Sequence, residues 1–166
     1  MVTAFILAGG KSTRMGEDKA LMAGGVERLV LLAQSIGIER VVTLCGSERR
    51  RGMFSGEVWP DPPTSNSLMD VLYWVLNQID DTIQLIPCDA FRLEEEGLLA
   101  LINSGGGIPF DGQGNRQPLL SNCPRGWTPK MDAKSIQDMF STLPDVNLGS
   151  LEKQMQNFNR PFPTES

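Results

Sequence analysis

The sequence predicts an α/β fold, in which a mostly parallel sheet lies between two layers of helices as a three-layer α/β/α sandwich. Short apolar runs rich in β-branched residues alternate with segments whose apolar residues recur every three to four positions. This alternation continues through about the first 105 residues, and glycine or proline separates the segments. Strands that alternate with helices are joined by right-handed crossovers and run parallel. We expect one domain covering residues 1–166.

The alternating part supplies four strands and three helices. Each expected strand is an apolar run that ends near glycine or proline, and the four runs are residues 2–7, 40–45, 58–59 and 82–86. Helical spacing of apolar residues predicts helices at residues 28–36, 68–79 and 93–102. Gly37 is a suitable C-cap for the first helix, and Ser65 or Asn66 is a suitable N-cap for the second.

The remaining residues predict less regular structure. Residues 105–121 surround the turn-rich segment Asp111–Asn115, which predicts two strands paired around it. Asp132 is expected to cap a helix over residues 136–143. A short strand is expected at residues 155–158.

The predicted sheet places three polar loops together. In open parallel sheets, ligands bind beyond the carboxyl ends of the strands. The loops that follow Leu7, Trp59 and Ile86 should therefore share one crevice. Each of these loops carries residues suited to binding phosphate or a metal ion.

Composition excludes several kinds of site. The chain has no histidine, which removes Ser-His-Asp and Cys-His catalysis. Its cysteines, Cys45, Cys88 and Cys123, are far apart, which argues against a structural zinc site and for buried or free thiols. No apolar run reaches the roughly 20 residues that cross a bilayer, and the segment Met1–Leu7 lacks the pattern of a signal peptide. We expect a cytoplasmic protein without membrane contact.

The charge distribution favours a small anionic ligand. A net charge of −5 argues against a nucleic-acid partner, because nucleic-acid-binding domains usually carry a basic face. Residues 1–51 carry eight Lys or Arg and five Asp or Glu, whereas residues 52–166 carry seven and fifteen. The basic side chains of the first part are thus available for a local anion.

The segment Leu7–Lys19, directly after the first strand, is rich in glycine and basic residues. Glycine lets backbone N–H groups turn towards an anion, and the basic side chains add positive charge. The segment is not a Walker A loop, because Phe5 stands where that motif needs a glycine before Gly10. It also lacks the Gly-x-Gly-x-x-Gly dinucleotide fingerprint. The segment therefore predicts a phosphate-binding loop of another kind.

Residues 7–19, Leu-Ala-Gly-Gly-Lys-Ser-Thr-Arg-Met-Gly-Glu-Asp-Lys, resemble without a gap the signature Leu-Ala-Gly-Gly-x-Ser-x-Arg-Met-Gly-x-Asp-Lys of the molybdenum cofactor guanylyltransferases (MobA-type). These enzymes are nucleotidyltransferases with a Rossmann-like fold. Related cytidylyl- and uridylyltransferases more often carry Ala-Ala-Gly in place of Ala-Gly-Gly. The resemblance implies catalytic contacts of Arg14 and Lys19 with a triphosphate. It also implies that the nucleotide is bound by Leu7, Ala8, Gly9, Gly10 and Lys19.

Two aspartates follow later strands of the predicted sheet. Pro87-Cys88-Asp89 resembles the family's Pro-Cys-Asp motif, which implies that Asp89 acts in catalysis and in binding nucleotide and metal; a helix N-cap is the alternative. One carboxylate with phosphate oxygens and waters is a common way to hold Mg²⁺. Asp61 ends a segment similar to the family's nucleotide-contacting one, and its alternative is a turn residue among prolines.

Two further segments resemble the family. Asn157-Phe158-Asn159-Arg160-Pro161 is similar to its Asn-x-Asn-Thr-Pro, which implies that Asn157, or alternatively Asn159, adds an amide oxygen to the metal shell. A solvent-facing side chain is the alternative for Asn157. Gln117-Pro118 stands where the family often has His-Pro.

The resemblance implies transfer of GMP from GTP to molybdopterin, which forms the guanine dinucleotide cofactor and pyrophosphate, with Mg²⁺ or else Mn²⁺. The acceptor phosphate is already anionic, so the protein acts by positioning and charge neutralisation. Alternatives are CTP or another phosphorylated acceptor, and an inactive nucleotide-binding relative, which the departures at Phe91 and residues 66–70 keep open. Expected partners are GTP, molybdopterin and, transiently, other cofactor-assembly proteins or molybdoenzymes.

Overall fold

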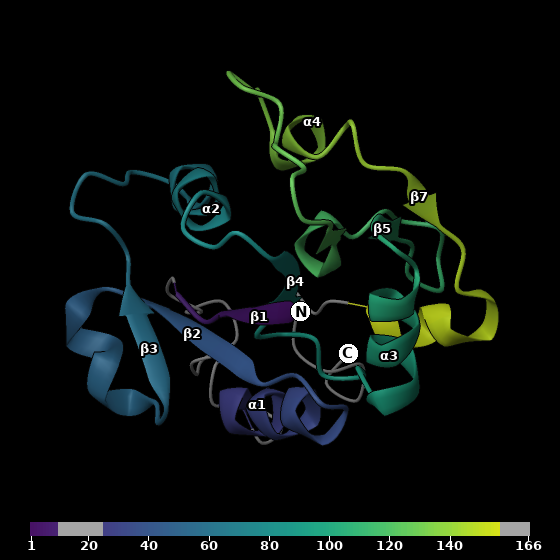
Figure 1. Cartoon of the computed structure of the whole chain (residues 1–166), viewed down its shortest axis with the longest axis horizontal. Helices are drawn as coiled ribbons and strands as arrows, with labels where there is room; N and C mark the ends of the chain where they lie inside the picture. Colours follow the sequence, from purple (N-terminus) through teal and green to yellow (C-terminus); the bar gives the residue numbers. More distant parts are fainter. Residues whose placement is uncertain (10–24, 157–166) are drawn as a thin grey trace, which may run out of the picture.

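The computed structural model describes residues 1–9 and 25–156, and Figure 1 shows how their strands and helices are arranged. Five strands form the main sheet in the order β3-β2-β1-β4-β6. Four of them are parallel: β1 (Val2–Leu7), β2 (Arg40–Gly46), β3 (Glu57–Pro60) and β4 (Thr82–Pro87). β6 (Asn122–Cys123) pairs antiparallel with β4 at one edge. The mostly parallel α/β sheet predicted from the sequence is confirmed.

Helices cover both faces of this sheet, which gives the predicted three layers (Figure 1). α1 (Gly25–Ser35) and α3 (Glu95–Asn103) pack on one face. α2 (Leu68–Leu76) and the short α4 (Ile136–Met139) pack on the other. None of the helices in the described part of the chain is long and apolar enough to span a membrane.

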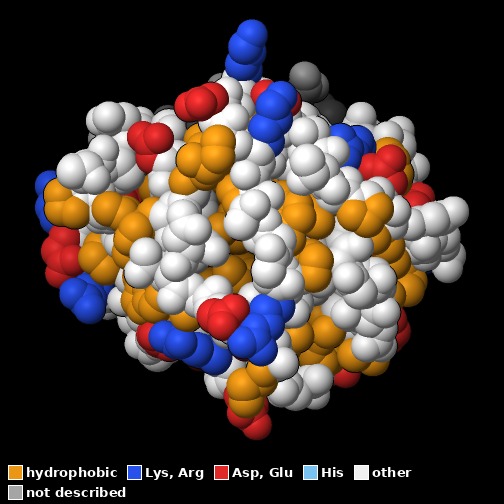
Figure 2. All heavy atoms as spheres, turned by 45° about the horizontal axis from the view of Figure 1, so that its top comes forward, with side chains coloured by type: hydrophobic (Ala, Val, Ile, Leu, Met, Phe, Trp, Pro, Cys, Tyr) orange, Lys and Arg blue, Asp and Glu red, His pale blue; other side chains and the backbone are white. Residues whose placement is uncertain are grey.

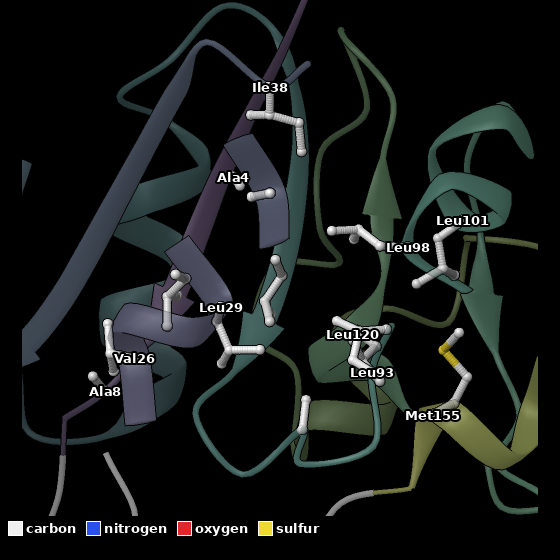
Figure 3. Close-up of a cluster of buried hydrophobic side chains, with 14 residues drawn as sticks. Ala4, Ala8, Val26, Leu29, Ile38, Leu93, Leu98, Leu101, Leu120 and Met155 are labelled. Atoms are coloured by element: carbon white, nitrogen blue, oxygen red, sulfur yellow. The ribbon is translucent and has the colours of Figure 1, made fainter. Parts of the chain in front are cut away.

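The alternation of side chains along β1 divides the core into two clusters, because successive residues of a strand point to opposite faces. Ala4 and Ile6 belong to the cluster under α1 and α3, whereas Phe5 and Leu7 belong to the cluster under α2 and α4. Figure 3 shows the first cluster, in which side chains from β1, α1 and α3 meet in one layer. β1 is therefore buried on both faces, which explains why all of its residues except Thr3 are apolar.

The end of α1 confirms the expected glycine cap. Gly37 has φ +95°, and its N–H donates to Gln34 O at 3.0 Å. The next N–H, that of Ile38, donates to Ala33 O at 3.2 Å. This pair of hydrogen bonds is the Schellman motif, in which the residue after the cap turns the chain away from the helix. The helix itself begins at Gly25, earlier than the predicted start at residue 28.

The N-caps of α2 and α4 differ from the expected ones. Ser67 caps α2 in place of Ser65 or Asn66, and Ser135 caps α4 in place of Asp132. An aspartate stands three residues after each serine, and its N–H donates to the serine Oγ at 3.2 Å in α2 and 3.0 Å in α4. The aspartate carboxylate in turn accepts the N–H of the residue before the cap. This reciprocal arrangement satisfies two N–H groups at once, which favours these serines.

Residues 105–121 do not form the predicted pair of strands. Within the described chain, one antiparallel bridge, between Phe110 and Arg116, flanks the turn. β5 (Ile108–Pro109) instead pairs in parallel with the distant β7 (Asp145–Val146), and residues Pro118–Leu120 form a 3₁₀ turn, η4. Two prolines in this stretch lack the N–H that a hairpin ladder requires, so no continuous ladder forms, and a second bridge, between Gly107 and Asn122, is separate from the first.

A buried polar network attaches this second half to the sheet. Gln84 of β4 is fully buried, and its Nε2 donates to Leu120 O at 2.9 Å. Its Oε1 accepts from Asn122 Nδ2 at 3.0 Å. An enclosed amide that loses its partners is costly, so the network favours a single position of η4 and β6 beside β4.

The end of the described chain forms a 3₁₀ helix where a strand was expected. η5 (Gly149–Met155) reaches into the predicted strand 155–158, of which residues 157 and 158 lie outside the described residues. Gln154 of η5 accepts at Oε1 from the N–H groups of Glu94 and Gly97, at 2.9 and 3.1 Å. The Gln154 side chain thereby supplies an acceptor for two N–H groups at the start of α3. Gln154 reaches these groups from a compact 3₁₀ turn rather than from an extended strand.

Leu29→Ala is expected to lower the free energy of unfolding by roughly 2–5 kcal/mol, because the substitution leaves a cavity between α1 and the sheet. Leu29 is only 1 % exposed. Urea unfolding followed by circular dichroism measures the change. Leu31→Ala on the same helix is the matched control, since Leu31 is 59 % exposed and its loss should change stability by at most about 0.5 kcal/mol. Equal destabilisation by both variants would contradict this packing of α1.

Candidate active site

A cavity of about 500 Å³ opens at the carboxyl ends of the parallel strands. The helix after β1 packs on one face of the sheet and the helix before β4 packs on the other, so β1 and β4 flank a topological switch point. Ligands of open α/β sheets bind at such points. Residues from the loops after β1, β3 and β4 line the cavity together, among them Gly9, Asp61 and Asp89. The predicted shared crevice is confirmed.

Hydrogen bonds extend the parallel ladder past the ends of β1 and β4. Cys88 N–H donates to Leu7 O at 3.1 Å, and Ala8 N–H donates to Leu44 O at 2.9 Å. These bonds fix the backbone of the first residues after each strand relative to the sheet. The residues that follow these bonded positions therefore lie beside the same cavity.

Gly46, the last residue of β2, brings the loops after β1 and β3 together. Its carbonyl accepts from Asp61 N–H at 2.7 Å. Gly9 packs so closely against it that a Cβ on Gly9 would lie 2.9 Å from Gly46 Cα. Gly46 has φ +84°, a conformation that side-chain-bearing residues rarely adopt. Backbone contact therefore requires glycine at both positions.

Arg50 clamps the ends of β1 and β2. It lies in η3 (Glu48–Met53) and donates from Nε to Cys45 O at 2.8 Å and from Nη2 to Ala8 O at 2.7 Å. Hydrogen bonds from a charged donor are stronger than neutral ones. Sequence reasoning missed this residue, because it belongs to a run of three arginines whose other members, Arg49 and Arg51, are exposed. Only tertiary burial distinguishes it.

Two carboxylates face the cavity from neighbouring loops. Asp89 is 7 % exposed, and it is not a helix cap, because Glu94 occupies the N-cap of α3. Burial raises the pKa of Asp61 above its usual value, since the charged form loses hydration. No Lys or Arg among the described residues lines the cavity. Among the described residues, Asp61 and Asp89 therefore set the charge of the cavity.

This arrangement fits a divalent cation bound together with a substrate. Mg²⁺ is usually held by one or two carboxylates, and phosphate oxygens and waters complete its octahedron. Within residues 1–9 and 25–156, no group of three Asp, Glu, Cys or His side chains is assembled as a metal cage made by protein alone. A carboxylate beside a cavity large enough for a small-molecule ligand is the kind of donor that remains for Mg²⁺ or Mn²⁺.

The start of α2 forms another wall of the cavity. Ser65, Asn66 and Leu68 line it. Asn66 N–H donates to Asp70 Oδ2 at 2.8 Å, which places a negative charge in the first turn of the helix. That charge offsets part of the positive potential of the helix end. Serine and asparagine side chains thus provide the polar groups of this wall.

The structure brings together the described members of the predicted site. Leu7, Gly9, Asp61 and Asp89 line one cavity, whereas Ala8 does not line it and buries its methyl group in the cluster under α1. The other predicted residues lie outside the described residues, namely Gly10, Arg14, Lys19 and Asn157. Sequence reasoning also missed a wall residue from η4, Leu119, because only long-range packing brings it to the cavity.

Two of the thiols are unsuited to act as nucleophiles at neutral pH. All three cysteines are free, as expected. Burial raises the pKa of the Cys45 thiol, and it raises the pKa of Cys123 to about 12. Because the thiolate is the reactive form, both side chains stay inert.

Known proteins resemble this chain in sequence and in fold. Residues 4–140 match the model of the family described as MobA-like NTP transferase domain. A protein of Synechococcus elongatus named "Probable molybdenum cofactor guanylyltransferase" is 34 % identical over 135 residues, which cover 76 % of this chain and 68 % of that protein.

Solved structures extend the likeness to the fold. A crystal structure from Aquifex aeolicus VF5 has a TM-score of 0.72 at 18 % identity and covers 94 % of this chain and 92 % of that chain. The crystal structure of molybdopterin-guanine dinucleotide biosynthesis protein A from Archaeoglobus fulgidus has a TM-score of 0.68 at 16 % identity, with coverage of 97 % and 93 %. At these identities the structures establish the fold, and the family follows from the sequence matches. The chain belongs to the MobA-like NTP transferase family and is a nucleotidyltransferase.

Proposed function

We propose that the chain transfers GMP from GTP to molybdopterin and releases pyrophosphate, which yields the guanine dinucleotide form of the cofactor. The observation that carries the proposal is the cavity at the switch point, where Gly9, Asp61 and Asp89 converge. The name of the Synechococcus relative and the Ala-Gly-Gly form of the signature support guanine as the base.

The nucleoside would lie against the start of the signature segment. Gly9 leaves room for a flat ring, because no side chain projects there, and Leu7 gives an apolar wall. Asp61 presents a carboxylate that can accept hydrogen bonds from the nucleotide. Arg50 holds the Ala8 carbonyl in place, so the backbone that meets the base is fixed before the nucleotide arrives.

Asp89 would hold Mg²⁺ or Mn²⁺, and the resemblance to the family adds Asn157 as a second oxygen donor. A bound divalent ion would neutralise phosphate charge at this site. The family resemblance likewise implies that Lys19 and Arg14 contact the triphosphate.

The reaction is an in-line displacement at the α-phosphorus of GTP. An oxygen of the acceptor phosphate forms the new P–O bond, while the bond from the α-phosphorus to the bridging oxygen of the β-phosphate breaks and pyrophosphate leaves. The attacking oxygen is already anionic, so no protein base is needed. The protein supplies orientation and countercharge, which accords with a chain that has no histidine.

Product analysis tests the proposal directly. We expect the protein, incubated with Mg²⁺, molybdopterin and equal concentrations of GTP, CTP and UTP, to form the guanine dinucleotide as the main product with one pyrophosphate per product. Mass spectrometry identifies the dinucleotide. A cytosine product would assign the chain to CTP instead, and stabilisation by GTP without any product would identify a nucleotide-binding relative without activity.

Asp89→Asn is expected to lower turnover by more than about 100-fold, because even outer-shell partners of a metal ligand contribute roughly 10- to 100-fold. The amide keeps the shape of the carboxylate but loses its charge. Pyrophosphate release across a Mg²⁺ titration measures the effect. Asp80→Asn is the matched control, since Asp80 is an exposed carboxylate paired with Arg125 away from the cavity. Unchanged turnover in Asp89→Asn would remove Asp89 from the site.

Arg50→Ala is expected to raise the KM for GTP about tenfold or more with a smaller change in kcat, because the loop start loses its fixed carbonyl before binding. Initial rates over a range of GTP concentrations measure both constants. Arg49→Ala removes the same charge from an exposed neighbour and should behave like the wild type. Equal KM increases in the two variants would show that charge, rather than the clamp, is what matters.

A further inference from the structure

A second hollow of about 450 Å³ adjoins the candidate active site. Leu119 of η4 lines both, so the two volumes meet at this side chain. The walls of the second hollow come from residues 111–119, from Ile136 and Gln137 of α4, and from Gln156. Most of its polar groups are side-chain amides.

Gln117 is the residue whose hydrogen bonding most clearly indicates a ligand. Its side chain is 8 % exposed, and its Nε2 donates to Asp111 Oδ2 at 3.0 Å. An ionised carboxylate can only accept hydrogen bonds, so the amide must present its NH₂ group to Asp111 and its Oε1 elsewhere. Among the described residues, no protein donor is bonded to this Oε1. It is not sealed in the core either, since the only fully enclosed unpaired side-chain atom in that part of the chain is Ser121 Oγ.

Asp111 is held in its ionised form, which keeps Gln117 in this orientation. Burial acts to raise the pKa of Asp111, but hydrogen bonds from Asn115, Gln113 and Gln117 outweigh it and lower the pKa. The N–H groups of Gln113 and Asn115 donate to Oδ1 at 2.8 and 2.9 Å. The turn after β5 is therefore built around this carboxylate rather than around a hairpin ladder.

The remaining charges favour an uncharged ligand. Arg116 donates from Nε to Asp145 Oδ1 at 2.9 Å and from Nη1 to Gln137 Oε1 at 3.4 Å, so Asp145 balances its charge. Figure 2 views the side of the molecule that carries α2 and α4, where hydrophobic side chains (orange) and uncharged side chains or backbone (white) occupy most of the middle, and charged side chains lie mainly towards the rim. An amide oxygen in such surroundings is matched best by N–H donors of a neutral ring.

We propose that this hollow binds the pterin ring of the acceptor, whose amino and ring N–H groups donate to Gln117 Oε1. The inference rests on the proposed function, which requires the acceptor phosphate to reach the α-phosphorus in the first cavity. The rest of the acceptor then extends past Leu119 into the second hollow. A site built to hydrogen-bond a ring discriminates strongly against rings that lack those donors, because its polar group is left unpaired.

Pterin itself is the probe for this hollow. Because pterin resembles guanine, the protein is first saturated with Mg²⁺ and a non-hydrolysable GTP analogue, and pterin is then titrated while its fluorescence is followed. Saturable binding in the presence of the analogue is expected. Absence of saturable binding, or displacement of pterin by the analogue, would overturn the inference.

Variants of Gln117 identify the contact. Gln117→Met should weaken pterin binding about tenfold, the amount expected for one hydrogen bond to a buried group. Gln117→His should restore it to within about threefold, since one ring nitrogen can donate to Asp111 while the other accepts. Affinity for the GTP analogue should stay unchanged in both variants, which also shows that they are folded. Gln78→Met, at an exposed position just after α2, controls for the substitution type.

The outcomes separate this inference from the proposed function. Wild-type pterin affinity in Gln117→Met would overturn the contact, whatever the turnover with GTP. Pterin binding without any GTP-dependent product would leave the hollow in place and overturn the proposed reaction instead.

Discussion

The hydrogen bonds that extend the parallel ladder beyond β1 are the constraint on which the site depends. Parallel pairing alone brings the carboxyl ends of strands to one edge, but it leaves the loops free to diverge. Here Ala8 bonds to Leu44 and Cys88 bonds to Leu7, so one more rung is added on each side of β1. Gly9 and Asp89 each lie one residue beyond such a rung. Groups held this firmly are preorganised, which is what catalysis by positioning requires.

The less regular half of the molecule is held by side chains rather than by ladders. Gln84 joins η4 and β6 to the sheet, and Gln154 joins η5 to α3. Asp111 organises the turn after β5 in the same way. Each is a buried polar group, and leaving any of them unpaired would be costly. Gln84 and Gln154 find partners in other segments, whereas the partners of Asp111 lie within its own turn. Short strands and single turns can therefore hold Leu119 in a definite place between the two hollows.

Local sequence signals predicted the parts of the structure that local physics determines. The strands β1 and β4 are buried on both faces, so their predominantly apolar sequences identified them, and Gly37 marked the end of α1. The shared crevice followed from the direction of the strands. The hairpin failed because Ile108 pairs with Asp145, far along the chain, and no local pattern encodes that pairing.

The residues of the candidate site divide along the same line. The position of Asp61 and Asp89 at the cavity could be predicted because each directly follows a recognisable strand. Arg50 could not, since burial alone separates it from Arg49 and Arg51, and burial is a tertiary property. Gln117 could not be predicted either, because its amide is oriented by a hydrogen bond to Asp111 across the turn.

The charge of the site follows from the two parts of the sequence. Among the described residues, the cavity walls carry the carboxylates Asp61 and Asp89 and no cation, and Asp70 adds a negative charge to the start of α2. A triphosphate would be repelled by these groups alone, because the interaction of like charges strengthens in a partly buried cavity. Under the proposed function, a divalent ion and the basic side chains of residues 7–19, which the family resemblance assigns to the triphosphate, would offset this repulsion. The nucleotide that such a site would accept is then the metal complex rather than the free triphosphate.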